Sequence, residues 1–133
     1  MPRAIGRFLK GIVVVALLVS ALPLTGCRKY HQLEKEIPVY QGSEFERTFK
    51  DSSNKKEHEL WIAEASTEDV SKYYQGQLEE KKWKKQMIVP SPDGSGYALA
   101  YTKGDKMLTF VIFARAGKKG ETYIDLSVVK TSK

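Results

Sequence analysis

MLTFVIFAR, the run from Met107 to Arg115, carries apolar side chains at both odd and even positions. Because side chains in a β-strand point alternately to the two faces of a sheet, this run predicts a central strand that is buried on both sides. The following run, Thr122 to Lys130, alternates apolar and polar residues and predicts a strand with one face in water. Lys103 to Lys106 forms a tight reversal before the central strand, with Gly104 suited to the first central position of a type II′ turn.

Four shorter segments upstream also have the character of strands. Glu44 to Lys50 and Glu57 to Ala63 alternate on either side of the turn-forming Asp51-Ser52-Ser53-Asn54, so they predict a hairpin. Trp83 to Val89 and Tyr97 to Thr102 flank a second turn-forming stretch, SPDGSG, and predict two more strands.

A helix is predicted between these two pairs of strands. Ser66 is suited to cap its start with Asp69 as the capping-box partner, and we expect the helix to run to about Lys82. Its apolar stripe recurs every four residues and should cover a sheet: Val70, Tyr74 and Leu78.

The resulting order, ββαββββ, with strands joined by short turns, predicts an α+β fold. We expect an antiparallel sheet of about five to six strands with one helix packed on it. Two such layers bury the helix stripe and one face of the sheet. The second apolar face of residues 107–115 then needs the N-terminal hairpin, a curled sheet or a partner to cover it.

The N-terminal segment has the pattern of an export signal. Three basic residues precede an apolar run from Ile12 to Leu22, and Leu24-Thr25-Gly26-Cys27 closes it. This motif resembles the lipobox of bacterial lipoproteins. The resemblance implies that Cys27 receives a diacylglyceryl group, becomes the new N-terminus and is N-acylated with a fatty acid such as palmitate. The alternatives are a plain secretory signal or a membrane-spanning anchor, although an apolar stretch of 11 residues falls short of the ~20 that a spanning helix needs.

Processing at Cys27 would divide the chain into a signal peptide (1–26), a lipidated tether (27–38) and one α+β domain (39–133). The mature chain of 107 residues suits a single domain. We interpret residues 28–38 as a tether because they are mostly polar and charged and end in Ile37-Pro38; a short helix through Tyr30 to Glu36 is the alternative. Cys27 is the only cysteine, so its acylation leaves no thiol for a disulfide.

The expected location is the cell envelope. Arg28 follows the cysteine where an Asp, in similar Gram-negative lipoproteins, commonly signals retention in the inner membrane. We therefore expect the periplasmic side of the outer membrane in a Gram-negative host, and the outer face of the plasma membrane otherwise. Arg3, Arg7 and Lys10 leave with the signal, so 19 basic residues face 16 acidic ones and the net charge falls from +6 to +3. This weak bias gives little support to a polyanionic partner, and we expect no nucleic acid.

From Ile37 onward the chain resembles a group of small exported bacterial domains, mostly in lipoproteins of unassigned function. The shared outline has a Pro and a nearby Gly, then a capped helix with a Val and paired aromatics, then a Leu and a Trp: Pro38, Gly42, Ser66, Val70, Tyr73, Tyr74, Leu78 and Trp83. The sequence departs from that outline at Lys81-Lys82, where a Gly is usual before the Trp. The resemblance implies a fold and assigns no catalytic residue.

Residues suited to catalysis or metal binding are sparse. His31 falls in the predicted tether and His58 in a strand, and neither has a nucleophile motif around it. Gly94-Ser95-Gly96 lacks the spacing of a nucleophile elbow, and Asp93 is too isolated for a calcium loop. We therefore expect no enzyme activity, no cofactor and no metal site.

Four lysines around Trp83 form the one suggestive patch: Lys81, Lys82, Lys84 and Lys85. Lysines at a helix C-terminus offset the helix dipole, and a Trp at a helix-to-strand junction favours the core, so a structural role is the first interpretation. The alternative is an anionic ligand: lipid headgroups, lipopolysaccharide phosphates or a cell-wall polymer.

These observations predict a lipid-anchored envelope lipoprotein with a non-enzymatic binding or adaptor domain. An exposed apolar patch that includes Trp61, Tyr97 or Tyr101 would favour another envelope protein as partner. A basic concavity would favour an anionic envelope component. An envelope enzyme is the other alternative, and it would need His58 beside a carboxylate in a deep pocket.

Overall fold

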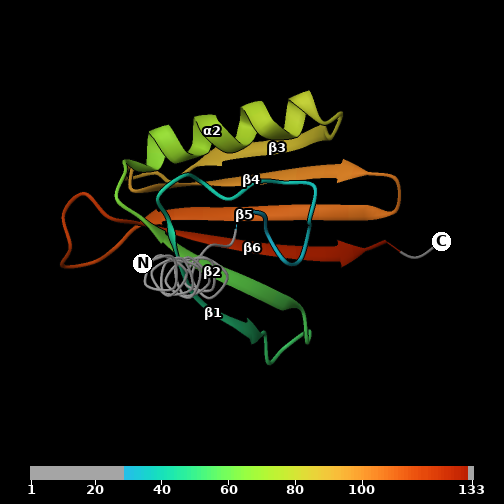
Figure 1. Ribbon diagram of the computed structural model, residues 1–133, viewed down its shortest axis with the longest axis horizontal. Helices are drawn as coiled ribbons and strands as arrows, with labels where there is room; N and C mark the ends of the chain where they lie inside the picture. Colours follow the sequence, from blue (N-terminus) through green and yellow to red (C-terminus); the bar gives the residue numbers. More distant parts are fainter. Residues whose placement is uncertain (1–28, 132–133) are drawn as a thin grey trace, which may run out of the picture.

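The computed structural model describes residues 29–131, so the predicted signal peptide and Cys27 lie outside the described residues. One helix packs on a six-stranded antiparallel sheet, as Figure 1 shows, which confirms the predicted α+β class. Along the chain the elements are β1 (Glu44–Lys50), β2 (Glu57–Ala63), α2 (Thr67–Glu80), β3 (Lys84–Pro90), β4 (Gly96–Lys103), β5 (Lys106–Ala114) and β6 (Thr122–Lys130). Within residues 29–131, no helix is long and apolar enough to cross a membrane.

The strands lie in the spatial order β1-β2-β6-β5-β4-β3. Strands β3, β4, β5 and β6 form a meander of neighbours, whereas the N-terminal hairpin joins the sheet through the last strand of the chain. His58 on β2 pairs with Ser127 on β6, and Ala63 pairs with Thr122. This pairing closes one continuous sheet from two parts of the chain that are separated by the helix.

The helix begins as predicted and ends two residues earlier than expected. The Ser66 hydroxyl accepts a hydrogen bond from the Asp69 N–H at 3.0 Å, which satisfies one of the free donors of the first turn. The last helical residue is Glu80, because Lys82 takes a positive φ of 70° that does not continue a helix. The Trp83 N–H then donates to the Leu78 carbonyl at 2.9 Å and turns the chain into β3.

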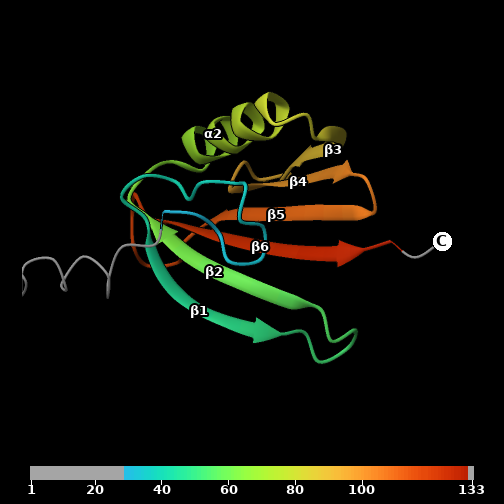
Figure 2. The same ribbon diagram turned by 45° about the vertical axis from the view of Figure 1, so that its right-hand side comes forward.

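Two segments cover one face of the sheet, the inner face, which carries Leu99, Phe110 and Leu126. Figure 1 shows that α2 lies over the β3 and β4 side, while the chain before β1 crosses β5 and β6 beside the helix. Figure 2 shows the same two segments on the same side of the sheet. The predicted helix stripe is buried there, and the Tyr74 ring stacks on the Phe110 ring with centroids 4.3 Å apart. The core therefore lies between the inner face and this mixed layer.

The segment interpreted as a tether belongs to the folded domain. His31 and Ile37 are fully buried, and the Glu34 side chain is nearly so. An isolated bridge joins Tyr30 to Pro38, and the His31 N–H donates to the Ile37 carbonyl at 3.0 Å. Residues 29–38 thus form a compact loop against the inner face instead of an extended linker, so residues that were assigned to the tether pack with the folded domain.

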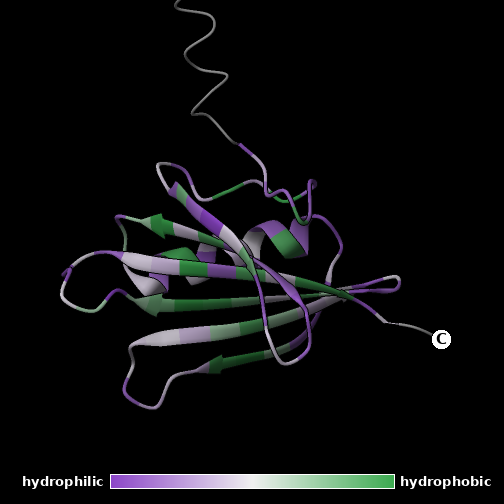
Figure 3. Cartoon of the chain, turned by 90° about the horizontal axis from the view of Figure 1, so that it is seen from below, coloured by the Kyte–Doolittle hydropathy of each residue, from purple (hydrophilic) through white to green (hydrophobic). Residues whose placement is uncertain are grey.

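The opposite face of the sheet, the outer face, has no covering layer among the described residues. Strand β5 lies between β4 and β6, so its central position is confirmed. The prediction that both faces of β5 are buried is wrong. Leu108, Phe110 and Ile112 are fully buried on the inner face, but Val111 and Phe113 are exposed on the outer face. Figure 3 shows that hydrophobic residues concentrate in the strands. The sheet keeps an apolar outer surface because, within residues 29–131, only one layer packs on it.

Candidate functional site

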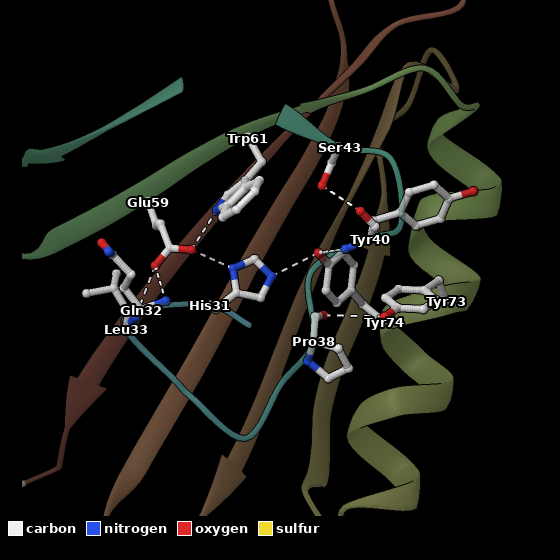
Figure 4. A network of polar contacts seen from close by, with 10 residues as sticks. All are labelled: His31, Gln32, Leu33, Pro38, Tyr40, Ser43, Glu59, Trp61, Tyr73 and Tyr74. Carbon is white, nitrogen blue, oxygen red and sulfur yellow. Dashed lines mark hydrogen bonds and ion pairs between the residues drawn. The ribbon is translucent and has the colours of Figure 1, made fainter. Parts of the chain in front are cut away.

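A buried polar network joins the N-terminal segment to the sheet and the helix. The Glu59 carboxylate on β2 and the His31 ring are both 0% exposed, and His31 Nδ1 lies 2.7 Å from Glu59 Oε1. His31 Nε2 lies 2.9 Å from the Tyr74 hydroxyl on α2, as Figure 4 shows. Three separate parts of the chain thus meet at one imidazole.

The Glu59 carboxylate accepts four hydrogen bonds. The Trp61 indole N–H donates to Oε1 at 2.6 Å, beside His31, while the backbone N–H groups of Gln32 and Leu33 donate to Oε2 at 2.7 and 3.0 Å (Figure 4). Burial by itself would raise the pKa of Glu59, but the hydrogen bonds that its carboxylate accepts, first from His31 and then from Trp61 and the Leu33 N–H, hold the pKa below its usual value. The carboxylate therefore stays ionised inside the core.

One proton assignment satisfies every group in the network. With His31 neutral and its proton on Nδ1, the ring donates to Glu59 and its Nε2 accepts from the Tyr74 hydroxyl. The Tyr74 oxygen in turn accepts from the Tyr40 N–H at 3.0 Å. The chain of donors runs from Tyr40 through Tyr74 and His31 to Glu59. These hydrogen bonds hold residues 29–40 on the sheet. Because the His31 ring is buried, it presents no surface to a substrate.

A second set of hydrogen bonds fixes the N-terminal segment near the C-terminal end of the helix. The Glu36 carboxylate accepts from the Trp83 indole N–H at 2.7 Å and from Lys103 Nζ at 2.8 Å. The bond from Lys103 is the main reason that the pKa of Glu36 falls below its usual value. Lys103 Nζ also donates to the Lys81 carbonyl at 2.8 Å, which ties the helix C-terminus to the β4–β5 turn.

The four lysines singled out from the sequence do not share one surface. Trp83 is buried, in agreement with the structural interpretation, and Lys81 caps the helix through its N–H, which donates to the Gln77 carbonyl. Lys84 pairs with Thr102 on the outer-face side of β4, whereas Lys85 pairs with Tyr101, whose side chain is in the core. Because neighbouring strand residues point to opposite faces, these two ammonium groups are directed apart.

His58 has a carboxylate partner but lies on the face of the sheet. Its Nδ1 is 2.7 Å from Asp125 Oδ1 on β6, and its ring stacks on Phe49 with centroids 4.7 Å apart. Asp51 Oδ2 is 4.0 Å from Nε2. His58 is thus a hydrogen-bonded side chain on the face of the sheet. Among residues 29–131, no group of three or more His, Cys, Asp or Glu side chains is arranged to hold a metal ion.

The outer face carries the largest set of exposed apolar side chains in the described part of the chain. Cross-strand pairing places them in rows: Val89, Ala98 and Val111 lie side by side, and Phe113 lies beside Tyr123. The members that are between 38% and 48% exposed are Met87, Val89, Val111, Phe113 and Val129. Of the aromatics considered from the sequence, Trp61 and Tyr101 are buried and Tyr97 is partly buried, so none of them forms this surface.

The sequence did hold one signal for the buried network. Glu59 shares its strand face with Trp61, and a carboxylate on a buried face requires donors. The identity of those donors could not be read, because His31 is 28 residues away in a segment of polar composition. No protein-family model, curated protein or solved structure matches this chain.

Proposed function

We propose that the chain is a lipid-anchored cell-envelope lipoprotein whose folded domain is a non-enzymatic binding or adaptor module. The support for the anchor is the N-terminal pattern: a basic start, a short apolar run and Leu24-Thr25-Gly26-Cys27. The lipid on Cys27 would hold the domain on the periplasmic side of the outer membrane in a Gram-negative host, or on the outer face of the plasma membrane otherwise. Two or three acyl chains are enough for stable attachment.

The observation that carries the binding role is the uncovered outer face. Contiguous apolar side chains on a small monomeric domain are typical of a surface that another molecule covers. Both edge strands discourage the alternative of pairing at the sheet edge, because β1 and β3 each contain a bulge and β3 ends in Pro90. The face of the sheet is therefore the better candidate for contact than its edges.

The charges around the outer face favour a protein as partner. Arg115 and Glu121 form an ion pair at 2.7 Å near Tyr123, and Asp125 pairs with His58 further along the face. Both signs of charge therefore border the apolar side chains, which is the usual anatomy of a protein interface, with an apolar centre and a polar rim. A polyanion would be better matched by a rim of one sign.

The anchor is tested by mass spectrometry of the protein purified from its native membrane. We expect a mature chain that begins at an acylated Cys27, and a Cys27→Ala variant that is unacylated and leaves the membrane fraction. An intact N-terminus with a bare thiol would refute the anchor.

The binding role is tested by a photo-crosslinking side chain at position 111 on the outer face. The matched control is position 76 on the helix, where an added Cβ meets nothing within 4 Å. We expect a protein adduct at position 111 in intact cells that is absent at position 76 and is lost when Phe113→Ser is added. Equal adducts at both positions, or none at position 111, would contradict a protein partner on this face.

The anionic-ligand alternative has its own readout. If the domain binds an anionic component through lysines, its binding to anionic vesicles should fall with salt and with Ser substitutions of Lys81, Lys82, Lys84 and Lys85. We expect the substituted domain to bind as weakly as the parent. A clear loss on substitution would favour the alternative over the outer face.

A further inference from the structure

The folded domain begins almost at the proposed lipid attachment point. The Lys29 carbonyl accepts a hydrogen bond from the Val39 N–H at 2.9 Å, and Tyr30 forms a bridge with Pro38. Two residues of extended chain span at most ~7 Å, so Cys27 stays within that distance of Lys29. Because so few residues separate Cys27 from Lys29, a lipid on Cys27 would bring the side of the domain that carries Lys29 close to the bilayer.

Three tyrosines gather on that side, and we refer to Tyr30, Tyr40 and Tyr73 as the tyrosine cluster. Tyr30 is 53% exposed, the most exposed large apolar side chain among residues 29–131. The Tyr40 and Tyr73 rings meet edge to face with centroids 5.1 Å apart, and the Tyr73 hydroxyl donates to the Val39 carbonyl at 3.2 Å. Both remain partly exposed, and Figure 4 shows them beside the helix.

The chemistry of the cluster suits the boundary between water and lipid. Tyrosine has an apolar ring and a polar hydroxyl, and it is enriched where the headgroups of a bilayer meet the acyl chains. Burial, and then the proximity of Tyr30 and Tyr40, raise the pKa of Tyr73, so its phenol is neutral at physiological pH. Lys29 is exposed next to the cluster and follows Arg28 in the sequence, which places cations where anionic headgroups attract them.

The cluster and the outer face lie on opposite sides of the sheet. The tyrosines belong to the layer of helix and N-terminal segment that covers the inner face, whereas Val111 and Phe113 project from the other side. Contact between the cluster and the bilayer would turn the outer face toward the aqueous compartment, where a protein partner can reach it.

We propose that the tyrosine cluster and Lys29 insert into the headgroup region of the bilayer that holds Cys27, so that the domain keeps one orientation with its outer face directed away from the lipid. This inference rests on the proposed acylation of Cys27. The occupant is the bilayer itself, since the short chain between Cys27 and Lys29 brings no other surface so close.

The experiment uses the mature acylated protein in vesicles of phosphatidylcholine and phosphatidylglycerol that contain bromine-labelled acyl chains, which quench nearby tryptophan. Tyr30→Trp reports on the cluster, Lys29→Trp is a second reporter on the same side, and Val111→Trp is the matched control on the outer face. The native Trp61 and Trp83 are buried and supply a constant background. We expect the added tryptophan at position 30 or 29 to be quenched at least about twofold more than the one at position 111.

The outcomes separate the orientation from the anchor. Acylated protein in which position 111 is quenched as strongly as positions 29 and 30, or in which neither reporter at 29 or 30 is quenched, overturns the orientation and leaves the anchor intact. Mass spectrometry that finds a bare Cys27 overturns the anchor, and the orientation with it.

Discussion

Replacing Glu59 by Gln should destabilise the domain strongly although it hardly changes the size of the side chain. The substitution keeps the shape of the side chain but exchanges one carboxylate oxygen for an NH₂ group. Oε1 accepts from His31 and Trp61, and Oε2 accepts from the Gln32 and Leu33 N–H groups, so either orientation of the amide sets donors against donors. A change of the His31 tautomer relieves one clash only by leaving the Tyr74 hydroxyl without its acceptor.

The magnitude follows from the bonds lost. A hydrogen bond to a charged group contributes about 1.5–3 kcal/mol, and two such bonds are removed in a site closed to water. Allowing for partial relaxation, we expect the free energy of unfolding to fall by about 3 kcal/mol, a large part of the 5–15 kcal/mol usual for a domain. The corresponding fall in Tm is about 12–24 °C for a domain of this size.

The assay is urea denaturation followed by far-UV circular dichroism, because the fluorescence of Trp61 changes with the substitution itself. Hydrogen exchange adds a local readout: the amides of Gln32 and Leu33 should lose protection. Asp125→Asn is the matched control, since within residues 29–131 the Asp125 carboxylate bonds only to His58 and remains 18% exposed to water. We expect this variant to lose less than about 1 kcal/mol. A loss below about 1 kcal/mol for Glu59→Gln would refute the reasoning.

Three further predictions test the same structure. Tyr74→Phe removes the hydroxyl that bonds to His31 and to the Tyr40 N–H, so it should lower the free energy of unfolding by about 1–3 kcal/mol. Tyr73→Phe removes only the bond to the Val39 carbonyl and should lower it by less than about 1 kcal/mol. Equal losses of the two variants in urea titrations would contradict this difference. Gly96→Ala places a Cβ 2.4 Å from the Ile112 carbonyl oxygen and should destabilise the domain by about 1–3 kcal/mol. Gly76→Ala lies in open space on the helix and should stabilise the domain by about 0.5–1 kcal/mol. Thermal melts that rank the two variants in the reverse order would exclude the close approach of β4 and β5. Folding lowers the pKa of Glu59, so the contribution of its carboxylate to stability is complete above pH 4.5, the usual pKa, and is lost as the pH falls through the folded pKa. The urea midpoint should therefore fall less steeply with acid in Glu59→Gln than in the parent protein. Parallel declines would count against an ionised buried carboxylate.

The elements themselves were accessible from local sequence. The bounds predicted for β1, β2 and β6 are those observed, because alternation with a period of two is visible within a single segment. The cap at Ser66 and the positive φ of 60° at Gly104 were likewise local. The end of the helix was misplaced because its last turn depends on Lys82, whose backbone conformation is set by the docking of Trp83 into the core.

The N-terminal segment was the main error, and its cause is physical. Residues 28–38 have the composition of a solvated linker, yet His31 and Glu34 are buried. A polar side chain enters a core only when partners satisfy it, and the partners of His31 are Glu59 and Tyr74, 28 and 43 residues away. Composition within the segment carries no information about those partners.

Patterns that repeat within a few residues were therefore enough to place the start of the helix, the strands and the turns, since capping, alternation and turn formation involve neighbours along the chain. Contacts between distant residues alone established the spatial order β1-β2-β6-β5-β4-β3, the packing of residues 29–43 beside α2 and the uncovered outer face. Those features depend on which surfaces remain uncovered after the elements form. The apolar side chains of β5 show that both faces of the strand are hydrophobic, but not which face the domain buries.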